Sequence, residues 1–191
     1  MGKAGVAAAI ITALLIVGVA VYVGNNPISK ATGSLYQKVQ NIGAGYLSSA
    51  QLTIYMQDPP DYTSDVSSIQ ISFSEIDLLS TNGSWIKVSG SQATIDLLQI
   101  ISLPKDLGTF RIPAGTYISV RFMVDQAQAT ISGKTVLLQI PSGSQTGLKV
   151  TISNGLTVSA GGGATLNVHI QADNNGIHNG LLIPAMSASV S

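Results

Sequence analysis

Cysteine is absent from this chain of 191 residues. Disulfide bonds, thiolate catalysis and lipid attachment through an N-terminal cysteine are therefore excluded. Charged residues are scarce as well: they make up 9% of the chain, against roughly 25% in a typical soluble domain. The nine basic and nine acidic residues cancel, so no net field favours nucleic acid or an anionic surface. Because 45% of the residues are hydrophobic, the sequence predicts a folded protein with a surface of Ser, Thr, Asn, Gln and Gly.

Residues that commonly carry catalysis are few and dispersed. His169 lies between alternating apolar residues, so we expect it to face outward from a strand. His178 lies in a segment rich in Asn and Gly that is typical of a turn. No pattern places a nucleophile beside a base, and Gly161–Gly163 lacks the Lys-Ser/Thr of a phosphate-binding loop. No basic cluster favours nucleic acid. The sequence therefore predicts no enzymatic activity, no cofactor and no nucleic-acid partner.

Three aspartates, Asp58, Asp61 and Asp65, lie close together in an oxygen-rich segment. Hard cations such as Ca²⁺ prefer carboxylate oxygens of this kind. The spacing fits no EF-hand, however, and Asp with Pro is also common in turns. Both a calcium site and an ordinary turn remain open at this point.

The chain contains one Asn-X-Ser/Thr sequon, at Asn82 in the segment Thr81–Ser84. Asn-Gly is the preferred dipeptide of tight β-hairpins, so this segment is expected to be an exposed turn. An exported chain can be N-glycosylated at such a turn. Asn82 is therefore a candidate glycan site, and the alternative is that Asn-Gly serves the turn alone.

The N-terminal part of the chain is strongly hydrophobic. After a short basic leader, residues 1–3, the run Ala4–Gly24 contains one polar residue, Thr12. A helix of about 21 residues would cross roughly 30 Å of hydrocarbon. This run exceeds the usual 7–15 residues of a cleaved signal segment. The pattern predicts one long α-helix over residues 4–48, which either crosses a membrane or packs against copies of itself.

Apolar residues continue at helical spacing beyond this run, which predicts an amphipathic end to the helix. We expect the following residues at a helix assembly interface: Ile10, Ile11, Leu14, Leu15, Val17, Val21, Leu35, Val39 and Ile42.

From residue 49 to residue 191 the apolar period changes to two. The pattern indicates nine or ten short strands separated by turn signals and predicts a β-sandwich surface domain. A phase slip predicts a β-bulge near Ser74-Glu75, and Trp85 is expected to fill the core. The predicted fold is thus mainly β, an antiparallel sandwich of immunoglobulin-like architecture behind one long hydrophobic N-terminal helix.

Two segments carry resemblances to known families. Lys3, Ala4 and Gly5 ahead of the hydrophobic run, together with Ala31–Gln40, resemble archaeal type IV pilins and archaellins. The resemblance implies that a membrane peptidase cleaves at this processing site, ahead of the helix.

The segments Gln51–Pro60, Ser84–Val88, Thr94–Leu98 and Ile112–Tyr117, with Ile140–Gly143 and Leu148–Val150, resemble the blocks of a bacterial and archaeal surface-protein domain family without an assigned activity. This resemblance implies export and a β-sandwich.

The sequence leaves three functions open. In the first, the chain is a homo-oligomeric subunit of an archaeal, type IV pilus-like filament that serves adhesion or biofilm formation. It would be membrane-inserted before assembly and extracellular afterwards, with helices in the core and sandwiches outside. In the second, the hydrophobic segment is cleaved and subunits join by strand donation. In the third, a monomeric surface protein is anchored by its helix.

Overall fold

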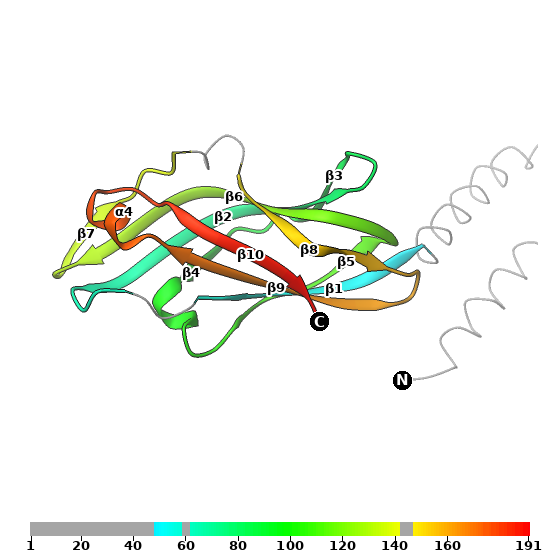
Figure 1. Cartoon of the computed structure of the whole chain (residues 1–191), viewed down its shortest axis with the longest axis horizontal. Helices are drawn as coiled ribbons and strands as arrows, with labels where there is room; N and C mark the ends of the chain where they lie inside the picture. The colour runs from blue at the N-terminus through cyan, green and yellow to red at the C-terminus, as the bar shows by residue number, and fades with distance from the viewer. Residues whose placement is uncertain (1–47, 59–61, 142–146) are drawn as a thin grey trace, which may run out of the picture. The chain divides into compact units, whose positions relative to one another are not determined.

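The computed structural model describes residues 48–58, 62–141 and 147–191, and Ser48–Ser191 forms one compact unit (Figure 1). Its elements, in chain order, are β1 (Ser49–Gln57), β2 (Val66–Ser80), β3 (Trp85–Ser89), β4 (Ala93–Asp96), the 3-10 turn η1 (Leu97–Ile100), β5 (Lys105–Pro113), β6 (Gly115–Ile131), β7 (Lys134–Leu137), β8 (Leu148–Val158), β9 (Gly163–Ala172), α4 (Asn174–His178) and β10 (Pro184–Val190).

The strands form one ten-stranded sheet in the order β3-β2-β6-β8-β10-β9-β1-β5, with β4 beside β2 and β7 beside β6. The sheet curls into a nearly closed, barrel-like shape. Most neighbouring strands are antiparallel, but β1 and β9 pair in parallel from Gln51↔Gly163 to Gln57↔His169. The strands β8 and β10 are also parallel and meet at one residue pair, Ala188↔Ile152. In Figure 1, β8 and β10 run in the same direction and diverge at their starts.

The predicted fold, an antiparallel immunoglobulin-like sandwich behind a long helix, is therefore wrong. The β8–β10 pair connects what would be two separate layers into one sheet, and the parallel pairing of β1 with β9 departs from an antiparallel layer. Alternation reveals which face of a strand is buried but not which strand lies beside it, so the sequence could not show these pairs. Within the described residues the helices are η1 and the five-residue α4, and neither is long and apolar enough to cross a membrane. Residues 4–47 of the expected helix lie outside the described part.

The core is built from the inward residues of the alternating strands, as the period of two predicted. Its largest fully buried side chains are Tyr117, Phe122, Leu52, Ile54, Ile69, Leu78, Leu97, Ile112, Ile152, Leu156, Leu166 and Ile170. The alternation is interrupted in β6, where Tyr117 is buried and its neighbour Ile118 is 41% exposed. The cause is an irregularity of the β6–β8 pairing between Tyr117 and Ser119, which changes the face that follows.

Two local predictions are confirmed. Thr81–Ser84 connects β2 to β3, with Gly83 at φ +87°, a backbone angle that glycine adopts without strain. The pairing of β2 with β6 shifts register between Phe73 and Glu75, where the bulge was expected.

Candidate functional site

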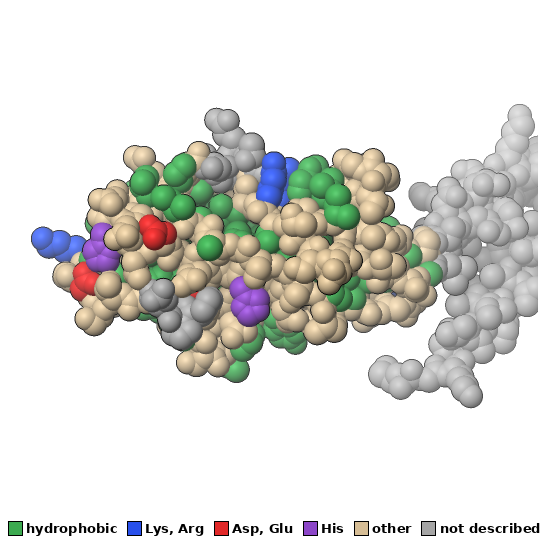
Figure 2. Space-filling model, viewed as in Figure 1, with side chains coloured by type: hydrophobic (Ala, Val, Ile, Leu, Met, Phe, Trp, Pro, Cys, Tyr) green, Lys and Arg blue, Asp and Glu red, His purple; other side chains and the backbone are tan. Residues whose placement is uncertain are grey.

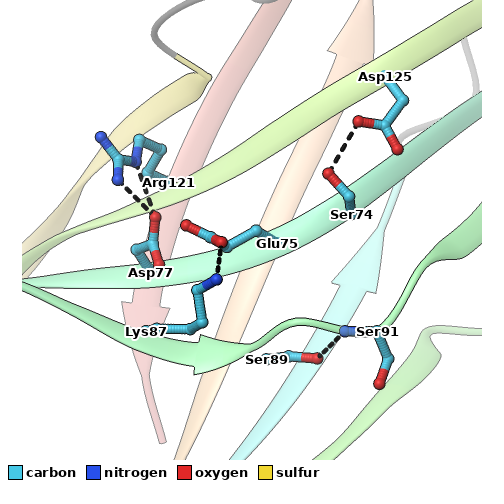
Figure 3. A network of polar contacts seen from close by, with 8 residues as sticks. All are labelled: Ser74, Glu75, Asp77, Lys87, Ser89, Ser91, Arg121 and Asp125. Atoms are coloured by element: carbon cyan, nitrogen blue, oxygen red, sulfur yellow. Dashed lines mark hydrogen bonds and ion pairs between the residues drawn. The ribbon is translucent and has the colours of Figure 1, made fainter.

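A cluster of ionic side chains lies on the outer face of β2, β3, β6 and β8. The strand register creates this cluster, because Asp77 pairs with Lys87 on β3 and with Arg121 on β6. Arg121 in turn pairs with Lys149 on β8. Residues paired in this way lie side by side on one face of a sheet. Figure 3 shows Asp77, Glu75, Lys87 and Arg121 gathered over these strands.

The centre of this cluster is the ion pair of Asp77 with Arg121. Nε and Nη2 of Arg121 both donate to Oδ2 of Asp77, at 2.9 Å and 2.6 Å. The Asp77 side chain is 2% exposed. Burial raises the pKa of Asp77, and the hydrogen bonds from Arg121 oppose that rise. Loss of Arg121 would leave a buried carboxyl without its cation, which is strongly unfavourable.

Glu75 and Lys87 form a second ion pair closer to solvent. Lys87 lowers the pKa of Glu75, and Glu75 raises the pKa of Lys87. Exposed pairs of this kind contribute little to stability. Nearby, Oγ of Ser74 donates to Oδ1 of Asp125 at 2.8 Å.

Trp85 belongs to this outer face, which corrects the prediction that it fills the core. The guanidinium carbon of Arg121 lies 4.3 Å from the centroid of the Trp85 ring, and Nζ of Lys149 lies 6.0 Å from it. Such distances are those of cation–π contacts. The neighbours Ile86 and Val88 pack against the core instead. The cluster is thus an ion-pair and aromatic network that ties β2, β3, β6 and β8 together.

Asp58 lies at the end of β1 and is fully buried. Its Oδ2 accepts a hydrogen bond from the Tyr62 hydroxyl at 2.7 Å, and that hydroxyl accepts one from the Ala172 N–H at 3.0 Å. The Asp58 N–H donates to the Ile100 carbonyl at 3.3 Å. Oδ1 of Asp58 has no hydrogen-bond partner among the residues that the structure describes. Burial raises the pKa of Asp58 to about 7, against the opposing hydrogen bond from Tyr62.

The structure gives two of the three candidate calcium ligands, Asp58 and Asp65, different surroundings. Asp58 points into the interior, whereas Asp65 lies at the surface and Asp61 lies outside the described residues. Oδ2 of Asp65 is 3.0 Å from Nε2 of His178. No group of three or more acidic or histidine side chains suited to a metal ion occurs within residues 48–58, 62–141 and 147–191.

His178 ends the short helix α4 rather than lying in a turn. The Asp173 carboxylate caps this helix by accepting the Gly176 N–H at 2.6 Å. Nδ1 of His178 is 2.8 Å from the Asn174 carbonyl. The carbonyl of Asn174 and the carboxylate of Asp65 raise the pKa of His178. Hydrogen bonds from Thr63 and His178 lower the pKa of Asp65. The pair thus ties the connection between β1 and β2 to the C-terminal part of the chain.

Some of the remaining predicted site residues lie in the described part of the chain, and the others lie outside it. Asn82 is exposed in the β2–β3 turn, where its Oδ1 accepts the Ser84 N–H at 2.9 Å. His169 lies between the buried Val168 and Ile170, in the outward position that was predicted. The processing-site residues Lys3, Ala4 and Gly5 lie outside the described residues. So do all of the expected helix-interface residues: Ile10, Ile11, Leu14, Leu15, Val17, Val21, Leu35, Val39 and Ile42.

Asp77 and Arg121 were not among the residues predicted from the sequence. The available signal was the position of each between apolar residues of a strand: Asp77 between Ile76 and Leu78, and Arg121 between Val120 and Phe122. A charge at the middle of such a strand requires a partner across the sheet.

A family model described as a domain of unknown function, DUF4382, matches residues 49–182. No curated protein matches the chain.

Proposed function

This chain belongs to the DUF4382 family of domains of unknown function, and we propose that it is a non-enzymatic structural subunit of an extracellular filament. The hydrophobic N-terminal segments would connect the subunits, and the β-domains would cover the outside. Adhesion or attachment to a surface is the role that we assign to such a filament.

The observation that carries this proposal is the connection of an almost uninterrupted apolar run, Ala4–Gly24, to a β-domain through residues 25–47. So long an apolar run is unfavourable in water and must be covered by lipid or by other protein. A self-assembling chain covers it with copies of itself after it leaves the membrane. The resemblance of Lys3-Ala4-Gly5 to an archaeal pilin processing site supports this order of events.

The surface of the β-domain suits an exposed filament. Outward hydroxyl groups pair across neighbouring strands, as in Thr53–Thr109 and Ser72–Thr94 at 2.8 Å and Thr116–Thr157 at 3.0 Å. Such pairs do not depend on ionisation, in contrast to ion pairs, which salt screens. Figure 2 shows few charged side chains on the viewed face. The outside of the filament would therefore tolerate changes of pH and salt.

The test is electron microscopy of material sheared from cells that express the full chain, with mass spectrometry of its subunits. We expect filaments built from this chain, with a mature N-terminus at Ala4 or Gly5. Leu14→Asp places a charge in the apolar run and should abolish the filaments, whereas Leu14→Met should preserve them. Recovery of the intact chain solely from detergent-solubilised membranes would instead indicate an anchored monomer and would refute the proposal.

A further inference from the structure

The sheet has an opening between β8 and β10. These strands are neighbours but meet at one residue pair, Ala188↔Ile152, from which their first halves diverge. On its other side β8 pairs with β6, and β10 pairs with β9. Within the described part of the chain, no strand pairs with the facing edges of residues 148–151 and 184–187.

A groove of about 400 Å³ occupies this opening. The residues that line it are mostly apolar, including Ile140, Leu148, Leu182, Pro184 and Met186, and Lys149 also lines it. In Figure 2, hydrophobic side chains are exposed over the region between the starts of β8 and β10. Two facing strand edges above an apolar groove are the arrangement that accepts an additional strand, because the edges supply backbone hydrogen bonds and the groove accepts alternate side chains.

The outer edges of the sheet are less suitable for pairing. The edge strand β5 begins at Lys105 and ends at Pro113, and the five-residue β3 carries the exposed Lys87. Lysine and proline at an edge, and a short edge strand, are features that prevent an additional strand from pairing. The opening between β8 and β10 is therefore better suited to a further strand than the edges of β3 and β5 are.

The N-terminal segment contains a sequence suited to this groove. Val17, Val19, Val21 and Val23 alternate with Gly18, Ala20 and Tyr22. In an extended strand the four valines lie on one face and could enter the groove, while the other residues face outward. Valine is among the residues that favour strands most strongly.

This segment joins the domain at the end opposite the groove. The Gly161 N–H donates to the Ser49 carbonyl at 2.7 Å, so β1 begins beside the turn that follows β8. The groove lies at the opposite end of β8, near Leu148. The length of β8 separates the two ends by roughly 30 Å. A segment that leaves one end of a domain and fits the other end of an identical domain connects copies head to tail, which generates an open filament.

We propose that Val17–Val23 of one copy inserts as an additional β-strand between β8 and β10 of the next copy. The connection between Val23 and Ser48 can extend to about 80 Å, which is enough to reach the groove of a neighbouring copy. This inference rests on the proposed filament function and specifies the joint between its subunits.

Disulfide cross-linking in filaments of the full chain tests the joint. Because the chain has no cysteine, the introduced pair is the sole source of disulfide bonds. Ala20→Cys on the outward face of the donated strand is combined with Ala185→Cys on β10, whose side chain is exposed. Gly18→Cys and Tyr22→Cys replace Ala20→Cys to sample the neighbouring registers. Ala20→Cys with Thr94→Cys, an exposed residue of β4 remote from the groove, is the matched control.

We expect the oxidised double variant to give a ladder of covalent multimers on a non-reducing gel, and the control pair and the single variants to give none. Intact filaments without a ladder in any of the three registers would overturn the inference and leave the filament function standing. A disulfide formed within single chains would show that each segment enters its own domain, and would also overturn it. Failure of the wild-type chain to form filaments would refute the proposed function itself.

Substitutions at alternate residues provide a second test. Val19→Lys and Val21→Lys place a charge on the face that enters the groove, whereas Ala20→Lys places the same charge on the outward face. We expect the two valine variants to lose filaments, measured per amount of exported chain, and Ala20→Lys to retain them. Equal loss in all three variants would contradict a strand and would indicate a joint that buries every side of the segment.

Discussion

The buried carboxyl of Asp58 should make this protein more stable in mild acid than at neutral pH. In the folded chain the pKa of Asp58 is about 7, whereas its ordinary value is 3.8. The folded state therefore retains the proton between these two values, and the unfolded state releases it. Stability decreases wherever the folded state binds more protons than the unfolded state. The contribution of Asp58 is thus fully favourable below about pH 4 and is lost as the pH rises through about 7.

The magnitude follows from the difference between the two pKa values. One unit corresponds to 1.36 kcal/mol, so a rise from 3.8 to about 7 destabilises the fold above pH 7 by at most about 4 kcal/mol. Asp58→Asn keeps an acceptor for the Tyr62 hydroxyl and is neutral at every pH. The variant should match the wild type near pH 4 and should exceed its stability at pH 8 by up to that amount.

Thermal unfolding of the purified full chain, followed by circular dichroism from pH 4 to pH 8, measures this difference. Asp125→Asn, which removes an exposed carboxylate, is the matched control and should leave the pH dependence as it is in the wild type. Tyr62→Phe removes the hydrogen bond that lowers the Asp58 pKa, so its stability should fall more steeply with pH. The reasoning would be refuted if the thermal midpoints of the wild type and Asp58→Asn changed with pH in parallel. It would also be refuted if Asp58→Asn were less stable than the wild type at pH 8.

Two further predictions concern the surface. The His178–Asp65 pair requires a charged histidine and a charged aspartate. Because the pKa of His178 is raised above its ordinary 6.5 and the pKa of Asp65 is lowered below its ordinary 3.8, the contribution of the pair is fully present between these two ordinary values and is lost as the pH rises through the pKa of His178. His178→Gln should therefore lower the thermal midpoint at pH 5.5 more than at pH 8.5, and an equal decrease at both would contradict the pair. If Asn82 carries a glycan, Asn82→Gln and Ser84→Ala should each reduce the mass of the exported chain by the same amount. An unmodified wild-type mass would exclude glycosylation at this turn.

The strand pattern and its local interruptions could be read from the sequence because they depend on neighbouring residues. Leu52, Ile54 and Met56 are buried on alternate positions of β1, as their spacing predicted. The turn at Asn82-Gly83 and the bulge between Phe73 and Glu75 also occur where the sequence placed them. Each of these features depends on backbone angles and faces within a few residues.

The candidate sites could be predicted only in part, because the role of a carboxylate depends on its burial and on the groups that surround it. Asp58 and Asp65 are close in sequence and were grouped as possible cation ligands. The structure buries Asp58 beside Tyr62 and places Asp65 against His178. The sequence contained both aspartates, but His178, the partner of Asp65, and Ala172, whose N–H holds the Tyr62 hydroxyl beside Asp58, come from far along the chain.

By itself, the sequence determined the chemistry of this protein: no cysteine, few charges, an apolar N-terminal run and strands with one buried face. The tertiary structure alone decided which strands pair. It placed β1 in parallel beside β9 and paired Asp77 with Arg121, and it left the groove open between β8 and β10. The physical reason is that alternation specifies a face, whereas pairing depends on long-range packing that brings distant edges together.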